Sequence, residues 1–220
     1  VTVGRSDKYD VWGTEESVDQ LGCIKFILNG TTAIQLKIPG SHQFGNALLA
    51  AAVALVSGVA SGEVKEVLEN FTAVKQRMEI FERRGILIVN DAYNANPDSM
   101  RAAIDYLISL PGRKGKKILV LGDMLELGDF AEREHEAIGR YIAGKPVDFV
   151  FLYGPLSPFV GRGLQKNNSG DIQAFSYETH EEIARHLDKI LAPGDVILLK
   201  GSRGMMMETI LQKLTILEGK

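Results

Sequence analysis

The chain has 220 residues and a formal net charge of −3, with 45% hydrophobic and 24% charged residues. These proportions are those of an ordinary globular protein, and the lack of a basic cluster argues against nucleic-acid binding. No apolar run approaches the ~20 residues that a membrane-spanning helix needs. The single cysteine, Cys23, has no internal disulfide partner, which fits a cytoplasmic location.

The first third of the chain carries a hairpin signal followed by helical patterns. Strands are expected at 24–28 and 33–38, and helices at 43–56 and 63–70. Asn29-Gly30 between the two strands is typical of a tight β-turn. The segment 43–56 is alanine-rich and apolar, which predicts a buried helix. We place a domain boundary near 71–76.

Beyond that boundary, strand and helix patterns alternate. Strands are expected at 78–82, 86–90, 117–121, 147–152, 172–175 and 195–199, and helices at 97–109, 131–143, 156–165, 179–191 and 203–217. Alternation with short connections predicts an α/β fold with a mainly parallel, Rossmann-like sheet and helices on both faces. The first two strands are separated only by Arg83-Arg84-Gly85, so that pair should be antiparallel.

The densest group of polar side chains follows the apolar run 86–89. It comprises Asp91, Tyr93, Asn94 and Asn96. Asn96 suits the N-cap of a helix and Pro97 suits its first position, since the missing N–H of proline needs no partner there. Open α/β sheets bind their ligands beyond the carboxyl ends of the strands. We therefore predict a ligand site at residues 91–96.

Five segments of the sequence resemble the Mur ligases and occur in that family's order. They are Gly40–Ala47, Gln76–Glu79, Asp91–Pro97, Leu121–Gly128 and Lys200–Gly204. Family members that join D-alanyl-D-alanine to UDP-N-acetylmuramoyl-tripeptide are the most similar. The resemblance implies that residues 1–73 are the tail of a central ATP-binding domain and residues 74–220 a carboxyl-terminal Rossmann-like ligase domain. No Gly-x-x-x-x-Gly-Lys-Ser/Thr phosphate loop occurs in the sequence, so we interpret the chain as a fragment that is inactive alone.

The resemblance also implies nucleotide-binding roles in both parts of the chain. Asn46 would lie beside the adenine of ATP, because an amide both donates and accepts hydrogen bonds, and His42 stands at the start of the same helix. Arg77 would contact an ATP phosphate and act as the catalytic residue, since a guanidinium binds phosphate bidentately. Asp91 would accept hydrogen bonds from the ribose hydroxyls. The structural alternatives are a helix cap for His42, a backbone hydrogen bond for Asn46, a surface ion pair with Glu79 or Glu82 for Arg77, and a turn cap for Asp91.

Substrate-binding residues are expected at the same edge of the sheet. Tyr93, Asn94 and Asn96 would line the junction between the nucleotide and the incoming dipeptide, or Asn96 would serve only as the N-cap. Lys200 and Ser202 follow the last predicted strand and open the last predicted helix, whose free N–H groups attract anions. We predict that both bind the terminal carboxylate of the dipeptide, in one cleft with Asn94 and Asn96. The alternative for Ser202 is a simple N-cap.

The implied reaction is ATP-dependent amide-bond formation in peptidoglycan precursor synthesis. ATP, D-alanyl-D-alanine and UDP-N-acetylmuramoyl-tripeptide are the expected partners, with Mg²⁺ held mostly by residues outside this chain. Asp123, Glu126 and His135 match no standard metal motif, so no metal ligand is predicted here. Two alternatives stay open. One is another ligase of the superfamily, such as a different Mur enzyme or folylpolyglutamate synthase, and the other is a non-catalytic nucleotide- or peptide-binding module.

Overall fold

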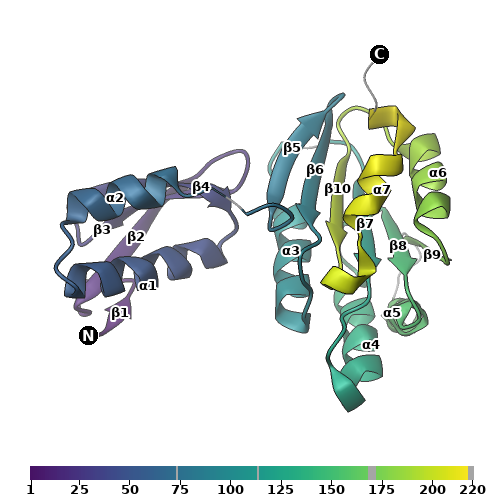
Figure 1. Ribbon diagram of the computed structural model, residues 1–220, viewed down its shortest axis with the longest axis horizontal. Helices are drawn as coiled ribbons and strands as arrows, with labels where there is room; N and C mark the ends of the chain where they lie inside the picture. Colours follow the sequence, from purple (N-terminus) through teal and green to yellow (C-terminus); the bar gives the residue numbers. More distant parts are fainter. Residues whose placement is uncertain (73, 113, 168–171, 218–220) are drawn as a thin grey trace. The chain divides into compact units, whose positions relative to one another are not determined.

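The computed structural model of the chain describes residues 1–72, 74–112, 114–167 and 172–217. It consists of two compact units, Val1–Ala73 and Val74–Lys220. Each unit has its own hydrophobic core, and Figure 1 labels the elements of each. Within the described residues, no helix is long and apolar enough to cross a membrane.

The first unit is a four-stranded sheet packed against two helices (Figure 1). Its elements are β1 (Val3–Gly4), β2 (Val11–Val18), β3 (Cys23–Leu28), β4 (Thr32–Pro39), α1 (His42–Val56) and α2 (Ser61–Asn70). The predicted hairpin is confirmed, because Asn29 and Gly30 join the antiparallel strands β3 and β4 with left-handed φ angles of 48° and 71°. The strand β2 was not predicted, since its second half is polar and exposed and lacks an alternating pattern.

The first helix, α1, is buried on one side only. Phe44, Ala47 and Leu48 pack into the core of the unit. On the other side, the exposed fractions of Leu49 and Val53 are 59% and 70%. The prediction of a buried helix is therefore wrong for one face of α1. An alanine-rich, apolar composition indicates that a helix can be buried. Whether a given face of the helix is buried depends on the elements that pack against it.

The second unit contains a six-stranded sheet in the order β5-β6-β10-β7-β8-β9. Its strands are β5 (Glu79–Arg83), β6 (Ile86–Asp91), β7 (Lys117–Gly122), β8 (Phe149–Tyr153), β9 (Gln173–Tyr177) and β10 (Val196–Lys200). The strands β5 and β6 are antiparallel, and all other neighbouring pairs are parallel. The structure therefore confirms the predicted α/β fold, including the antiparallel pair at one edge.

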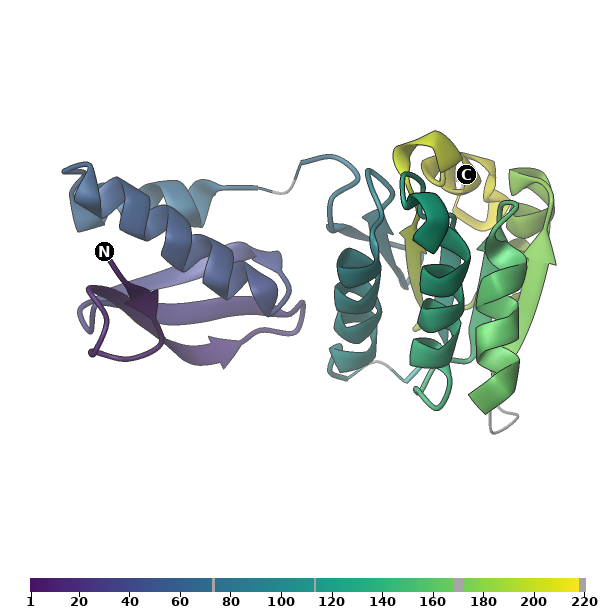
Figure 2. The same cartoon turned by 90° about the horizontal axis from the view of Figure 1, so that it is seen from below.

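The helices of the second unit cover both faces of this sheet. They are α3 (Pro97–Ser109), α4 (Ala131–Ile142), α5 (Ser157–Asn167), α6 (His180–Ile190) and α7 (Glu208–Lys213). Figures 1 and 2 show α3, α4 and α5 side by side on one face, with α6 and α7 on the other. Successive residues of a strand point to opposite faces. Accordingly, Leu87 and Val89 join the core under α3 to α5, while Ile86 and Ile88 join the core under α6 and α7.

The last segment of the chain is not the single helix that its pattern predicts. It forms 3-10 turns at Arg203–Met205 and Thr215–Leu217 on either side of α7. Met206 has a left-handed backbone, with φ at 46°, and interrupts the helix. Met205 and Met207 are both buried while Met206 is exposed. Positions two residues apart lie about 200° apart around an α-helix, so a continuous helix would not bury both on one face.

Candidate functional site

The carboxyl ends of β6 and β10 lie side by side, as the sequence predicts. The two strands are parallel, with Asp91 opposite Lys200. Lys200 Nζ donates to Asp91 Oδ2 at 2.5 Å and to the backbone carbonyl of Asn94 at 2.9 Å. Only 1% of the surface of Lys200 is exposed, so its ammonium joins the two strand ends inside the protein. We call residues 91–96 and 200–204, which meet here, the rim.

Asp91 uses both of its carboxylate oxygens within the fold. Oδ1 accepts from the backbone N–H of Met78 at 3.0 Å, and Oδ2 accepts from Lys200. The side chain of Asp91 keeps 14% of its surface exposed. Each carboxylate oxygen has two lone pairs, so Asp91 retains acceptor capacity toward a diol on its exposed side. Asp91 does not cap the following helix, because that role belongs to Asn96.

The Ser202 side chain also forms hydrogen bonds within the protein. Its Oγ accepts from the backbone N–H of Leu125 at 2.8 Å and donates to the carbonyl of Ala95 at 3.3 Å, and only 4% of its surface is exposed. Its own N–H donates to the carbonyl of Asp123 at 3.0 Å. Both side chains are thus engaged in contacts within the protein. The prediction that Lys200 and Ser202 contact the dipeptide carboxylate gains no support from these contacts.

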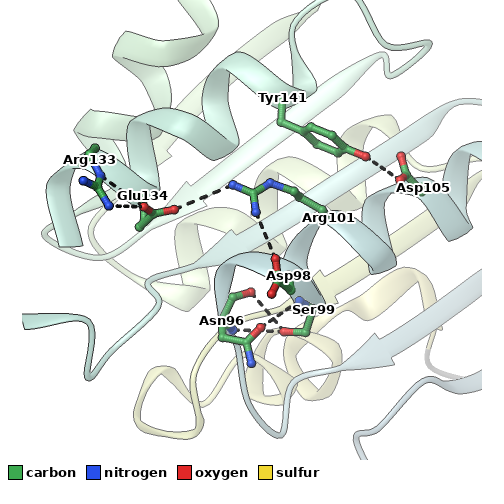
Figure 3. Close-up of polar contacts among 8 residues, drawn as sticks. All are labelled: Asn96, Asp98, Ser99, Arg101, Asp105, Arg133, Glu134 and Tyr141. Atoms are coloured by element: carbon green, nitrogen blue, oxygen red, sulfur yellow. Dashed lines mark hydrogen bonds and ion pairs between the residues drawn. The ribbon is translucent and has the colours of Figure 1, made fainter. Parts of the chain in front are cut away.

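Asn96 caps the helix α3, which follows the rim (Figure 3). Its Oδ1 accepts from Ser99 N–H at 2.8 Å, and the Ser99 hydroxyl accepts from Asn96 N–H at 3.0 Å. Farther along the helix, Arg101 lies between Asp98 of α3 and Glu134 of α4. The N-cap interpretation of Asn96 is confirmed. Its contact with a substrate stays a prediction, and its amide Nδ2 group is the donor that could make that contact.

Arg77 presents an exposed guanidinium beside the rim. Its Cζ lies 4.2 Å from the centre of the Tyr93 ring, a cation–π arrangement. Among the described residues, no carboxylate forms an ion pair with Arg77, so neither of the two glutamates proposed as alternatives holds it. Glu79 instead accepts from Gln76 N–H at 3.2 Å and from Asn90 Nδ2 at 3.0 Å. The guanidinium is therefore held by a ring and keeps its charge and its donors for an anion.

The residues on both sides of Arg77 have left-handed backbones. Gln76 has a φ of 62° and Met78 a φ of 48°, and such a conformation costs roughly 1–2 kcal/mol for a residue with a Cβ. The surrounding rim holds them in place, because Tyr93 N–H donates to the carbonyl of Gln76 at 2.9 Å and Asp91 accepts from Met78. We call residues 76–78 the strained segment. Pattern analysis missed it, because no glycine marks it in the sequence.

His42 and Asn46 lie on the first turns of α1 in the first unit. Asn46 Nδ2 donates to Gln43 Oε1 at 3.1 Å, and Gln43 Nε2 lies 3.1 Å from His42 Nε2. Asn46 also lines a mostly apolar groove of about 350 Å³. The other residues that line this groove are Leu36, Lys37, Ile38, Gln43, Ala47, Ala50, Val67, Leu68 and Phe71. The amide thus bonds a neighbouring side chain and stands at the edge of a hollow of ligand size.

A second hollow, of about 670 Å³, lies at the carboxyl ends of β8 and β9 in the second unit. It is lined by Tyr153, Gly154, Pro155, Ser157, Pro158, Ser176, Tyr177, Glu178, Gly204 and Met205. His180 fixes one wall, because its Nε2 lies 2.9 Å from the carbonyl of Met205 and its ring packs on Tyr153 at 4.3 Å. Sequence reasoning missed this pocket. The signal that could have found it is Gly154-Pro155, a turn that follows an apolar strand at the ligand edge of the sheet.

Asp123 links three loops at the same edge. It follows β7 and is 1% exposed, its Oδ2 accepts from Leu156 N–H at 3.0 Å, and its carbonyl accepts from Ser202 N–H. Its Oδ1 has no hydrogen-bond partner among the described residues. Burial raises the pKa of the Asp123 carboxyl above its usual value, against the lowering effect of the Leu156 hydrogen bond.

His135 is bonded within the same edge of the sheet. Its Nε2 accepts from Met124 N–H at 3.0 Å, and its Nδ1 lies 2.7 Å from the carbonyl oxygen of Ala131. The same Nε2 is 3.9 Å from Asp123 Oδ1. In the described part of the chain, no group of three His, Cys, Asp or Glu side chains is placed to hold a metal ion.

The family model described as "Mur ligase, glutamate ligase domain" matches residues 76–203, which is more than half of the chain. The chain belongs to the Mur ligase family. The matched range begins at the strained segment and ends within the rim. It therefore includes Arg77, Asp91 and Lys200, the residues whose contacts organise this edge of the Mur ligase sheet.

Two named relatives and two solved structures are similar to this Mur ligase chain. UDP-N-acetylmuramoyl-tripeptide–D-alanyl-D-alanine ligase from Bacillus subtilis (strain 168) is 39% identical, with coverage of 81% of this chain and 39% of that protein. The protein of that name from Mycobacterium tuberculosis (strain ATCC 25618 / H37Rv) is 34% identical, with coverage of 92% and 44%. The solved structure of MurF from Acinetobacter baumannii has a TM-score of 0.81 and 31% identity, with coverage of 95% and 46%. MurF ligase from Thermotoga maritima, solved in complex with ADP, has a TM-score of 0.75 and 25% identity, with coverage of 92% and 45%. This chain spans less than half the length of these relatives.

Proposed function

We propose that this chain is the carboxyl-terminal part of an ATP-dependent cytoplasmic ligase. The ligase would join D-alanyl-D-alanine to UDP-N-acetylmuramoyl-tripeptide in peptidoglycan precursor synthesis. The relatives whose names state that reaction support the proposal. The observation that carries it is Arg77, an exposed cation held over Tyr93 on a strained backbone, without a carboxylate partner among the described residues. A cation that is positioned but unpaired suits an anionic ligand such as a phosphate.

The proposed reaction has two steps. A carboxylate oxygen of the tripeptide attacks the γ-phosphorus of ATP, which gives an acyl phosphate and ADP. The dipeptide amine then attacks the acyl carbon, loses a proton, and displaces phosphate as the amide forms. Arg77 would bind the transferring phosphoryl group, whose charge is redistributed in the transition state. Asp91 would accept hydrogen bonds from the ribose hydroxyls on its exposed side.

In the first unit, we propose the groove beside Asn46 for the adenine of ATP. Its apolar walls suit a flat ring, and the Asn46 amide can pair with the donor and acceptor atoms on the ring's edge. His42, linked to Asn46 through Gln43, would set the orientation of this amide. Residues 1–73 would accordingly be the end of the central ATP-binding domain, and residues 74–220 the carboxyl-terminal ligase domain.

For the dipeptide, we propose the pocket at the ends of β8 and β9. Its volume lies in the usual range for small-ligand sites, roughly 300–1,000 Å³. The hydroxyls of Ser157 and Ser176 would donate to the dipeptide carboxylate, and the amine end would extend from the pocket toward the rim, where Tyr93 and Asn94 would line the junction with the nucleotide. Lys200 and Ser202 would act indirectly, by holding the rim. Mg²⁺ would accompany ATP, but the described residues offer no cluster for it, so no step is assigned to it in this chain.

Calorimetric titration of the 220-residue chain tests the pocket directly. We expect D-alanyl-D-alanine to bind and L-alanyl-L-alanine not to bind, because the pocket is chiral. Ser176→Val should weaken the binding of the dipeptide. Ser17→Val, at an exposed position of the first unit, should leave the binding unchanged. Equal binding of both stereoisomers, or equal effects of both variants, would exclude the pocket as the dipeptide site.

Product analysis tests the ligase. An intact enzyme that contains this chain should convert UDP-N-acetylmuramoyl-tripeptide and D-alanyl-D-alanine to the pentapeptide product and release one phosphate for each amide formed. The 220-residue chain alone should release none, since its sequence has no phosphate loop. If the enzyme instead preferred a single amino acid, such as glutamate, to the dipeptide, it would be a different ligase of the superfamily.

A further inference from the structure

We propose that Arg203 is a positioning residue for Arg77. In this inference, Arg203 holds the side chain of Gln76 and thereby fixes the strained segment that carries Arg77. The inference rests on the proposed role of Arg77 toward an ATP phosphate. Arg203 itself does not touch the nucleotide in this assignment.

The strained segment requires external support. Gln76 and Met78 both have left-handed backbones, a conformation that a free chain would leave. The N–H of Gln76 donates to Glu79 Oε2 at 3.2 Å, and its carbonyl accepts from Tyr93 N–H at 2.9 Å. The backbone of Gln76 is therefore tied to β5 and to the rim, and its side chain is the third point of attachment.

Arg203 supplies that third attachment from the far end of the chain. Its Nη1 donates to Gln76 Oε1 at 2.5 Å and to Glu208 Oε1 at 2.6 Å. Glu208 opens α7 and its side chain is only 15% exposed. Arg203 thus connects a fixed carboxylate on α7 to the strained segment.

The two arginines differ in how their charges are used. The charge of Arg203 is balanced by Glu208, whereas no described carboxylate pairs with Arg77. Arg77 instead rests on the ring of Tyr93, the residue whose N–H holds the carbonyl of Gln76. A shift of Gln76 would therefore move Arg77 relative to its ring. These contacts point to Arg77 as the anion ligand and to Arg203 as its support.

Side-chain NMR of the 220-residue chain tests the positioning step without any nucleotide. The Nε–Hε resonance of Arg77 should be shifted by the ring current of Tyr93. Arg203→Ala and Gln76→Ala should each return it toward its free position, and the double variant should add little. Arg133→Ala is the matched control, because Arg133 also contacts a glutamate and an aromatic ring, but on α4. An unchanged Arg77 resonance in both Arg203→Ala and Gln76→Ala would overturn the inference.

Kinetics of the intact ligase test the consequence. Arg203→Ala and Gln76→Ala should each lower kcat about tenfold, since a misplaced catalytic group loses its alignment, and should leave KM for D-alanyl-D-alanine unchanged. Arg203→Lys, which keeps a donor for Gln76, should recover most of the loss. If Arg203→Ala is impaired while Gln76→Ala is normal, Arg203 acts on the ligand directly and the inference is wrong. If the NMR shifts occur and kcat does not change, the positioning holds and the proposed role of Arg77 fails.

Discussion

Lys200 and Asp91 form a buried ion pair that ties the carboxyl end of β10 to that of β6. Their Nζ and Oδ2 atoms are 2.5 Å apart, at the edge where an α/β sheet binds its ligands. Lys200 is fully enclosed, whereas Asp91 keeps a small exposed surface. Lys200 therefore holds the two strand ends together inside the protein. Asp91 is the member of the pair that a ligand can reach.

Replacing Lys200 with methionine should destabilise the protein strongly. The change leaves the carboxylate of Asp91 with an uncompensated charge in a largely buried position, which costs about 3–5 kcal/mol. Urea denaturation measures the free energy of unfolding. Lys166→Met is the control, because the ion pair of Lys166 with Glu136 is exposed, and exposed ion pairs contribute little to stability. Equal losses in the two variants would contradict the importance of the buried pair.

Asp91→Asn should raise KM for ATP in the intact ligase. A hydrogen bond to a charged acceptor is worth about 1.5–3 kcal/mol, so the loss of the ribose contacts corresponds to a rise of roughly tenfold or more. Lys200→Met disturbs the same ion pair without removing the carboxylate, and it therefore serves as the comparison. If both variants raise KM for ATP equally, the effect comes from the disturbed rim and Asp91 does not bind ribose.

Substitutions of Asn96 separate its two roles. Asn96→Ala should lower the free energy of unfolding by about 1 kcal/mol through loss of the cap, while Asn96→Ser should keep most of it. Thermal or urea denaturation gives these values. A substrate contact through Nδ2 would show as weaker dipeptide binding in the stable serine variant. Normal dipeptide affinity in Asn96→Ser would restrict Asn96 to capping α3.

Asp123 should make stability depend on pH in an unusual direction. Burial raises its folded-state pKa above the ordinary value of 3.8, so the folded state binds the proton more tightly than the unfolded state. The ionised form therefore lowers the free energy of unfolding, and this loss develops as pH rises from 3.8 through the raised pKa. The stability of Asp123→Asn relative to wild type should accordingly increase across that window and then level off. Denaturation of both proteins from about pH 4 to pH 8 measures the difference, and an advantage of wild type that grows with pH would refute it.

Arg77→Ala should affect catalysis far more than stability. The exposed cation–π contact with Tyr93 is worth only about 0.5–1 kcal/mol. Loss of a charge that stabilises the transition state lowers kcat on the order of 100-fold. Steady-state kinetics of the intact ligase, paired with denaturation of the variant, gives both numbers. A wild-type kcat would show that the guanidinium does not reach the phosphate.

Local patterns were sufficient for much of the architecture. The alternation of apolar strands with amphipathic helices determined the parallel sheet, and Asn29-Gly30 determined the hairpin, because backbone preferences and periodic burial act over a few residues. The same reasoning placed Asp91 at a carboxyl strand end and Asn96 at a helix N-cap. Each of these features depends on neighbours in the sequence.

Contacts between distant segments decided the rest. Whether Lys200 faces a ligand or an internal carboxylate depends on Asp91, which is 109 residues away in the chain. The support of Gln76 by Arg203 spans 127 residues, and no local propensity predicts a left-handed backbone at Gln76. The break at Met206 likewise follows from burying both of its neighbours. Local sequence patterns thus predicted most of the helices and strands and the polar residues at the ligand edge. The pairing of those residues, and the charge that is left for a ligand, depend on tertiary contacts, because burial and pairing require the complete set of neighbours in space.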